Sequence, residues 1–167
     1  MKRLVILLCF APLLFSCSAD EGGLQGSLKD FYNLSFESVR ARLYPTELSI
    51  EYVRAGGQVP VRITLKQQPD QPIKTATYDL VTLGNITGRS GDNDIPRFVT
   101  GTLKLTEFEA VNGSRIVGEF ECQFATGDDK ASLSGDFDAN LEVVAQIVGY
   151  DVDLSYLEDA GDAGDAF

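Results

Sequence analysis

Apolar residues recur at every second position along most of this chain, and turn residues separate the alternating runs. Val39, Ala41 and Leu43 alternate with polar side chains, and the same alternation continues through residues 48–53 and 59–65. A period of two places every apolar side chain on one face of a strand, whereas a helix needs a period of roughly 3.6. The chain is therefore predicted to fold as an all-β domain.

Two short turns predict how the first three strands pair. Residues 44–47 place Pro45 at the second position of a β-turn, where its fixed φ is favourable. Gly56-Gly57 provides a two-residue hairpin loop, because glycine adopts positive φ without a steric penalty. Both registers keep the apolar side chains on one face, which a slip by one residue would destroy. The predicted pairs are Leu43–Leu48, Ala41–Ile50, Val39–Tyr52, Arg40–Glu51, Tyr52–Val61, Ile50–Ile63 and Leu48–Leu65.

The second half of the chain is predicted to add further strands. Residues 75–83 are expected to form a strand and residues 84–96 an irregular loop, and strands resume at 97–108, 115–124 and 131–144. Two meanders of this kind give about eight antiparallel strands, which pack as a sandwich or close as a barrel.

The turns at Asn112-Gly113 and Gly127-Asp128 predict the pairing inside the second meander. Asn-Gly favours a type I′ turn, which joins two strands through a two-residue loop. Several predicted pairs place phenylalanine opposite glycine, so that a ring covers backbone that lacks a side chain. The predicted pairs are Leu105–Phe120, Leu103–Cys122, Gly101–Phe124, Lys104–Glu121, Phe124–Ala131, Cys122–Leu133, Phe120–Gly135, Gly118–Phe137 and Glu119–Asp136.

The N-terminus has the pattern of a secretory leader. Lys2 and Arg3 precede an apolar run, and that run is shorter than the ~20 residues that a membrane-spanning helix needs. Residues 14–17, Leu-Phe-Ser-Cys, resemble the lipobox of bacterial lipoproteins. The resemblance implies cleavage before Cys17, a diacylglycerol on its sulfur and anchoring in a membrane. Ser18 then favours the outer membrane over the inner one, while an ordinary leader cleaved nearby is the alternative.

Four segments follow from these patterns. Residues 1–16 are the predicted signal peptide and residues 17–27 a lipidated flexible tether, since they are small and polar. Residues 28–150 form the all-β domain. Residues 151–167 carry six acids and no base, which predicts a disordered acidic tail.

Composition excludes several classes of function. The chain contains no histidine, which removes Ser-His-Asp and Cys-His catalysis and histidine-containing zinc sites. Once Cys9 leaves with the leader and Cys17 is acylated, Cys122 is the only thiol, and its strand position predicts a buried core residue. The net charge of −11 makes nucleic acid a poor partner. No cofactor is predicted.

Acidic residues supply the remaining candidate sites. A strip on one outward face is a possible contact surface or weak cation site, with an ordinary solvated face as the alternative; its residues are Glu119, Glu121, Asp136 and Asp138. Two loops offer oxygen ligands for calcium, although the same residues are common in turns. These weaker candidates are Asp92, Asp94, Asp128 and Asp129.

The predicted lipid anchor, together with the classes of function that composition excludes, predicts a membrane-anchored lipoprotein with a non-enzymatic binding or envelope-structural role. One alternative is a lipocalin-like barrel, which would enclose a hollow for an apolar ligand. The other is a histidine-free hydrolase, which would hold two carboxylates about 5–10 Å apart in a cleft.

Overall fold

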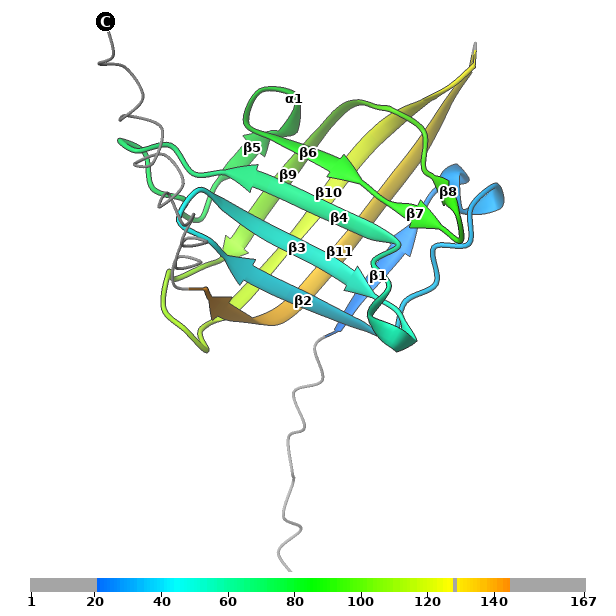
Figure 1. Cartoon of the computed structure of the whole chain (residues 1–167). Helices are drawn as coiled ribbons and strands as arrows, with labels where there is room; N and C mark the ends of the chain where they lie inside the picture. Colours follow the sequence, from blue (N-terminus) through cyan, green and yellow to red (C-terminus); the bar gives the residue numbers. More distant parts are fainter. Residues whose placement is uncertain (1–20, 128, 145–167) are drawn as a thin grey trace, which may run out of the picture.

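A computed structural model describes residues 21–127 and 129–144 of the chain. The predicted all-β class is confirmed: one curled mixed sheet of nine strands forms a half-barrel, and a separate two-stranded hairpin lies beside it (Figure 1). The predicted signal peptide, lipobox and acidic tail lie outside the described residues, as does Asp128.

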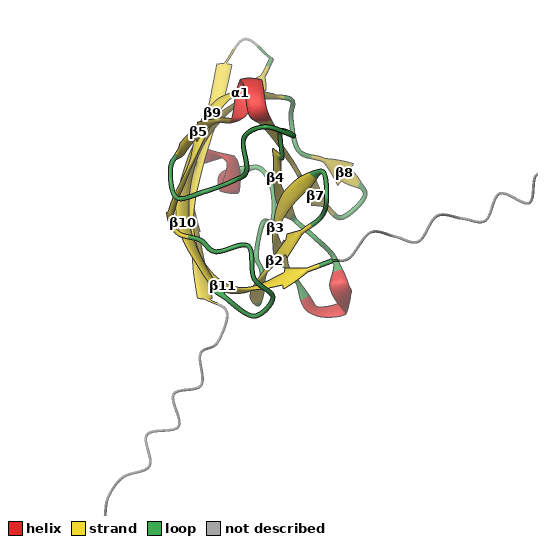
Figure 2. Ribbon diagram, turned by 90° about the vertical axis from the view of Figure 1, so that its left-hand side faces the viewer, coloured by secondary structure: helices red, strands yellow, loops and turns green. Residues whose placement is uncertain are grey.

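The strands follow one another around the curled sheet in the order β5-β9-β10-β11-β2-β3-β4-β6, and β1 pairs with β11. Figure 2 shows β9 and β10 in one curved layer and β2, β3 and β4 in the other, with β11 joining the two at the bottom. The strands are β1 (Glu21–Gln25), β2 (Ser38–Leu43), β3 (Glu47–Val53), β4 (Val61–Lys66), β5 (Thr77–Asp79), β6 (Gly84–Thr87), β7 (Arg89–Ser90), β8 (Asn93–Asp94), β9 (Phe98–Glu107), β10 (Arg115–Thr126) and β11 (Asp129–Val143). The helical segments are α1 (Leu80–Leu83) and the 3-10 turns η1 (Ser27–Asp30) and η2 (Ala55–Gly57).

The first meander has the predicted register throughout. Every pair proposed between β2 and β3 and between β3 and β4 is observed. The backbone N–H of Tyr44 donates to the carbonyl of Glu47 at 2.8 Å, which closes the turn around Pro45. Gly56 and Gly57 both have positive φ, 82° and 80°, as the hairpin between β3 and β4 requires.

The predicted register of the second meander is correct between β10 and β11 and wrong between β9 and β10. All predicted pairs between β10 and β11 are observed, including Phe120 with Gly135. Between β9 and β10 the prediction is displaced by two residues, so Phe120 lies opposite Leu103 instead of Leu105. The side chains keep their predicted faces, because a displacement of two preserves strand parity.

The Asn112-Gly113 turn explains that displacement. Gly113 has a φ of 84°, but no described residue other than glycine has positive φ, so the turn is not the type I′ predicted from Asn112. Gly113 N–H donates to the carbonyl of Leu141 at 2.7 Å, and the Asn112 side chain accepts from Val143 N–H at 2.9 Å. The turn therefore attaches to β11, and the β9–β10 ladder begins only at Glu107, next to a bulge.

Two of the three predicted glycine–phenylalanine pairs are present. Phe137 lies opposite Gly118 and Phe120 opposite Gly135. A Cβ added to Gly118 would lie 2.5 Å from Phe137 Cζ, so the ring occupies the space where a side chain would be. The third predicted pair is wrong, because Gly101 lies opposite Cys122.

Residues 21–27 belong to the folded domain, which corrects the predicted tether of 17–27. β1 pairs with β11 from Glu21 to Gln25, and η1 begins at Ser27. Leu24 and Leu28 are buried in the core. The alternation pattern did not predict this strand, because Gly22 and Gly23 lower its apolar content and interrupt the alternation.

The connection between the two meanders also differs from the prediction. The predicted strand over 75–83 is shorter, because the Asp79 side chain accepts from Val81 N–H at 2.9 Å and caps α1. The predicted loop over 84–96 contains β6 and the β7–β8 hairpin. β11 pairs with β2 in parallel from Leu141 to Val143, so the sheet is mixed and not purely antiparallel.

Side chains from both layers fill the interior of the half-barrel. Tyr52, Phe120, Phe124 and Phe137 are among the largest fully buried residues, and aliphatic side chains from both layers surround them. The Tyr52 and Phe120 rings meet edge to face across the layers, with centroids 6.0 Å apart. The polar residues of the strands therefore lie on the two outward faces.

Candidate functional site

The predicted acidic strip lies on the outward face of β10 and β11. Glu119 and Asp136 are opposite each other, as predicted, and both are exposed. Glu121 is exposed on the same face, and Asp138 is half-buried. The structure therefore brings the four acids together on one surface, through the side-chain alternation of two adjacent strands.

Basic side chains neutralise part of this strip. Lys104 Nζ lies 2.7 Å from Glu119 Oε1, which corrects the predicted pairing of Lys104 with Glu121. Arg115 Nε donates to Asp138 Oδ1 at 2.8 Å, and this bond lowers the pKa of the Asp138 carboxyl below its ordinary value. Within the described part of the chain, the Glu121 carboxylate has no such partner.

A shallow hollow runs beside the strip. One part, of about 360 Å³, is lined by Thr100–Thr102, Glu121–Gln123 and Ser132–Ser134. The adjoining part, of about 170 Å³, shares Glu121 and Ser134 with the first. The surface thus offers hydroxyls and carboxylates to a partner.

The weaker calcium candidates remain separate. Asp92 and Asp94 lie at the exposed β7–β8 hairpin, where Asp94 Oδ1 is 3.3 Å from Arg89 Nε. Asp129 begins β11 opposite Thr126. Among residues 21–127 and 129–144, no cluster of three or more histidine, cysteine, aspartate or glutamate side chains is placed to hold a metal ion.

Cys122 is buried, as predicted. Its Sγ lies 3.0 Å from the carbonyl oxygen of Leu133, to which the thiol donates. Burial raises the pKa of the thiol to about 12. A thiol that stays protonated is a poor nucleophile, so this environment favours a packing role.

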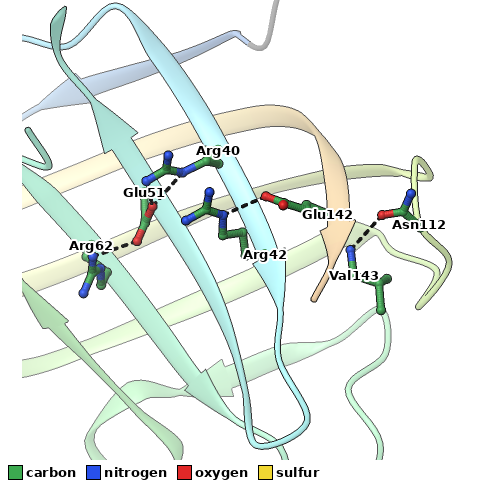
Figure 3. Close-up of polar contacts among 7 residues, drawn as sticks. All are labelled: Arg40, Arg42, Glu51, Arg62, Asn112, Glu142 and Val143. Carbon is green, nitrogen blue, oxygen red and sulfur yellow. Dashed lines mark hydrogen bonds and ion pairs between the residues drawn. The ribbon is translucent and has the colours of Figure 1, made fainter. Parts of the chain in front are cut away.

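The opposite outward face carries a cluster that the sequence did not single out. We define the arginine face as the outward side chains of β2, β3 and β4: Arg40, Arg42, Glu47, Ser49, Glu51, Arg62, Thr64 and Lys66. Glu51 is 3% exposed, although it points away from the core. Arg40 Nε donates to its Oε2 at 2.8 Å, and Arg62 Nη2 lies 2.8 Å from its Oε1 (Figure 3). Two guanidinium groups therefore cover this carboxylate.

Ser49 occupies the centre of the arginine face. It lies between Arg42 on β2 and Thr64 on β4, and it is 2% exposed. Its hydroxyl is the one buried side-chain polar atom in the described residues that has no hydrogen-bond partner. Arg42 contacts Glu142 of β11, with Nε 2.7 Å from Oε2 (Figure 3). The centre of the arginine face therefore holds a hydroxyl group that can still donate a hydrogen bond.

Part of the arginine face follows from the predicted registers. The pairing of Arg40 with Glu51 was predicted, and the register of Tyr52 with Val61 places Arg62 beside Glu51 as well. Glu142 could not be placed, because its approach to Arg42 depends on the parallel contact between β11 and β2.

No helix in the described part of the chain is long and apolar enough to cross a membrane. Comparison of the sequence with protein-family models and with curated proteins, and of the fold with solved structures, gave no match.

Proposed function

We propose that this chain is an exported, lipid-anchored domain that acts by non-enzymatic binding or as a structural part of a bacterial envelope. The proposal rests on residues 1–17, in which two basic residues and an apolar run precede a segment that resembles a lipobox, and on β1, which begins at Glu21, four residues after Cys17. At roughly 3.5 Å per extended residue, the two Cα atoms lie within ~14 Å of each other. An acylated Cys17 would hold the folded domain against the membrane surface, and Ser18 favours the outer membrane.

The chemistry of the domain supports binding over catalysis. The chain has no histidine, and burial keeps the Cys122 thiol protonated at neutral pH. The one buried carboxylate on the arginine face, Glu51, is paired with two guanidinium groups. The carboxylates of the acidic strip lie on an outward face, and Lys104 and Arg115 already pair with two of them.

The interior also supports a surface-acting domain over a carrier of apolar ligands. A carrier barrel needs a hollow of several hundred Å³ among apolar side chains. Here Tyr52, Phe120, Phe124 and Phe137 occupy the space between the layers, each less than 2% exposed. Contacts with a partner are therefore expected on the outward faces.

Replacing the proposed acylation site tests the anchor. Cys17→Ser should move the protein from the membrane fraction to the soluble fraction and abolish incorporation of a labelled fatty acid. Two acyl chains hold a protein firmly, because each buried methylene contributes about 0.8 kcal/mol. Ser18→Ala, next to it, should leave both readouts unchanged. Membrane partition and labelling that persist in Cys17→Ser would contradict the proposal.

Within this proposal the acidic strip serves as a contact surface and not as a cation site. Lys104 and Arg115 already pair with two of its acids, which leaves Glu121 and Asp136 for an ion that takes six to eight oxygen ligands. Millimolar calcium should therefore leave the unfolding temperature unchanged. A calcium-dependent rise that disappears in Glu121→Gln would instead identify a cation site, since ligand binding to the native state stabilises it.

A further inference from the structure

We propose that the acidic C-terminal segment of this chain, residues 151–167, docks on the arginine face of the same molecule. This inference is independent of the lipid anchor. It rests on the unused donors of the arginine face, on the place where the chain leaves the folded domain, and on the charges of the two surfaces.

The arginine face keeps donors for further anions. Each guanidinium has five N–H donors in a fixed plane. Arg40, Arg42 and Arg62 remain 37%, 28% and 47% exposed while they contact Glu51 and Glu142. The Ser49 hydroxyl beneath them has no partner among the described residues. A carboxylate placed between Arg42 and Thr64 would accept from a guanidinium and, after a small shift of the Arg42 side chain, from this hydroxyl.

The chain leaves the folded domain at the edge of this face. β11 ends beside β2, where Val143 lies opposite Leu43 and Val144 N–H donates to the Leu43 carbonyl at 2.9 Å. Arg42 is the next residue of β2, and its side chain already contacts Glu142. The segment that follows Val144 therefore starts next to β2, the strand that carries Arg40 and Arg42.

The segment is long enough to reach every part of the face. Adjacent strands are about 4.8 Å apart, so β4 lies roughly 14 Å from β11 across β2 and β3. The first acid, Asp151, follows Val144 by seven residues, which span up to ~24 Å when extended. Arg62 and Lys66 on β4 are thus within reach of the first acid and of all later ones.

Charge complementarity selects this face over the other one. The segment carries six acids and no base: Asp151, Asp153, Glu158, Asp159, Asp162 and Asp165. The arginine face carries four basic residues against three acids when Glu142 is included, in a chain whose net charge is −11. The acidic strip on β10 and β11 would repel the segment. Because the segment is covalently attached, its effective concentration near the face is about millimolar, which favours contacts too weak for a free peptide.

Carbodiimide cross-linking of the full chain tests the docking. The reagent activates a carboxyl group, which condenses with a nearby amine to an amide with loss of water. Lys66 is the amine on the arginine face, Lys130 provides a matched exposed amine on β11, and Lys104 on β9 is an amine that is already paired with Glu119. Mass spectrometry of the digested protein should find the acids of residues 151–165 linked to Lys66 at least tenfold more often than to Lys104 or Lys130.

Further measurements distinguish docking within one molecule from its alternatives. The Lys66 link should fall at least fivefold in 0.5 M salt, about where the Debye length shortens to a few Å. It should also fall in the double variant Arg42→Gln/Arg62→Gln, and it should not change on tenfold dilution. Links spread evenly over the three lysines, or unchanged in the double variant, would overturn the proposal. A link lost on dilution would show that the segment binds a second copy instead.

Discussion

Burial controls the chemistry of Cys122 at the residue scale. The fold raises the pKa of its thiol to about 12, whereas the thiol ionises near 8.5 in an unfolded chain. Because the unfolded chain loses this proton first, the contribution to stability is complete below about pH 8.5 and declines as the pH rises toward 12. The decline is at most ~1.4 kcal/mol per pH unit for one group.

Urea unfolding between pH 8 and pH 10 checks this effect. The slope of the unfolding free energy against pH should be smaller in Cys122→Ala than in the parent chain. Tyr52, whose pKa is also raised by burial, should contribute only above about pH 10. A thiol reagent should react slowly with the native protein and rapidly in denaturant. Equal slopes, or fast native labelling, would show that the thiol is ionised within the fold.

Glu51 makes a second prediction at this scale. Glu51→Gln leaves two arginines that still reach water, so it should cost about 1–2 kcal/mol of unfolding free energy. The double variant Arg40→Met/Arg62→Met leaves a buried carboxylate without a counter-charge and should cost about 3–5 kcal/mol. Arg97→Met, which changes an exposed arginine, should cost about 0.5 kcal/mol or less.

The order of these costs is the decisive result for Glu51. A double variant that is no less stable than Glu51→Gln would mean that water, and not the two arginines, solvates Glu51.

At the scale of elements, register decides which charges meet. Because the Asn112-Gly113 turn binds β11, the β9–β10 ladder places Lys104 opposite Glu119 and not opposite Glu121. A double-mutant cycle between Lys104→Gln and Glu119→Gln should give a coupling of roughly 0.2–1 kcal/mol. The matched cycle with Glu121→Gln should give a value near zero. A larger coupling of Lys104 with Glu121 than with Glu119 would support the register that the sequence predicted and contradict the observed one.

At the scale of the whole molecule, β1 protects the strand that joins the two layers. It covers the edge of β11 from Ser134 to Asp138 and buries Leu24. A chain that begins at Gly26 should lose several kcal/mol, since burying one leucine alone contributes about 1.5–3 kcal/mol. It should also self-associate, because an uncovered strand edge pairs with other chains.

A chain that begins at Glu21 is the matched control for this deletion. It keeps β1 and should match the parent chain in unfolding temperature and remain monomeric in light scattering. If the chain that begins at Gly26 has the same stability as this control, β1 is not an integral part of the sheet.

The sequence alone determined the fold class and the pairing wherever a short turn joins two alternating strands. β2, β3 and β4 and the β10–β11 hairpin have the predicted registers, because each turn leaves one register that keeps apolar residues on one face. The acidic strip follows from the same alternation, and so does the burial of Cys122.

Only the tertiary structure decided the contacts between distant segments. Glu142 bonds to Arg42 from 100 residues away, and β1 pairs with β11 across a similar separation. The Asn112-Gly113 turn has the local sequence of a tight hairpin, yet its hydrogen bonds to β11 move the neighbouring register by two residues. Local patterns restrict which face a side chain takes. Which strands become neighbours depends on how the whole sheet curls to bury that face, and no local pattern encodes it.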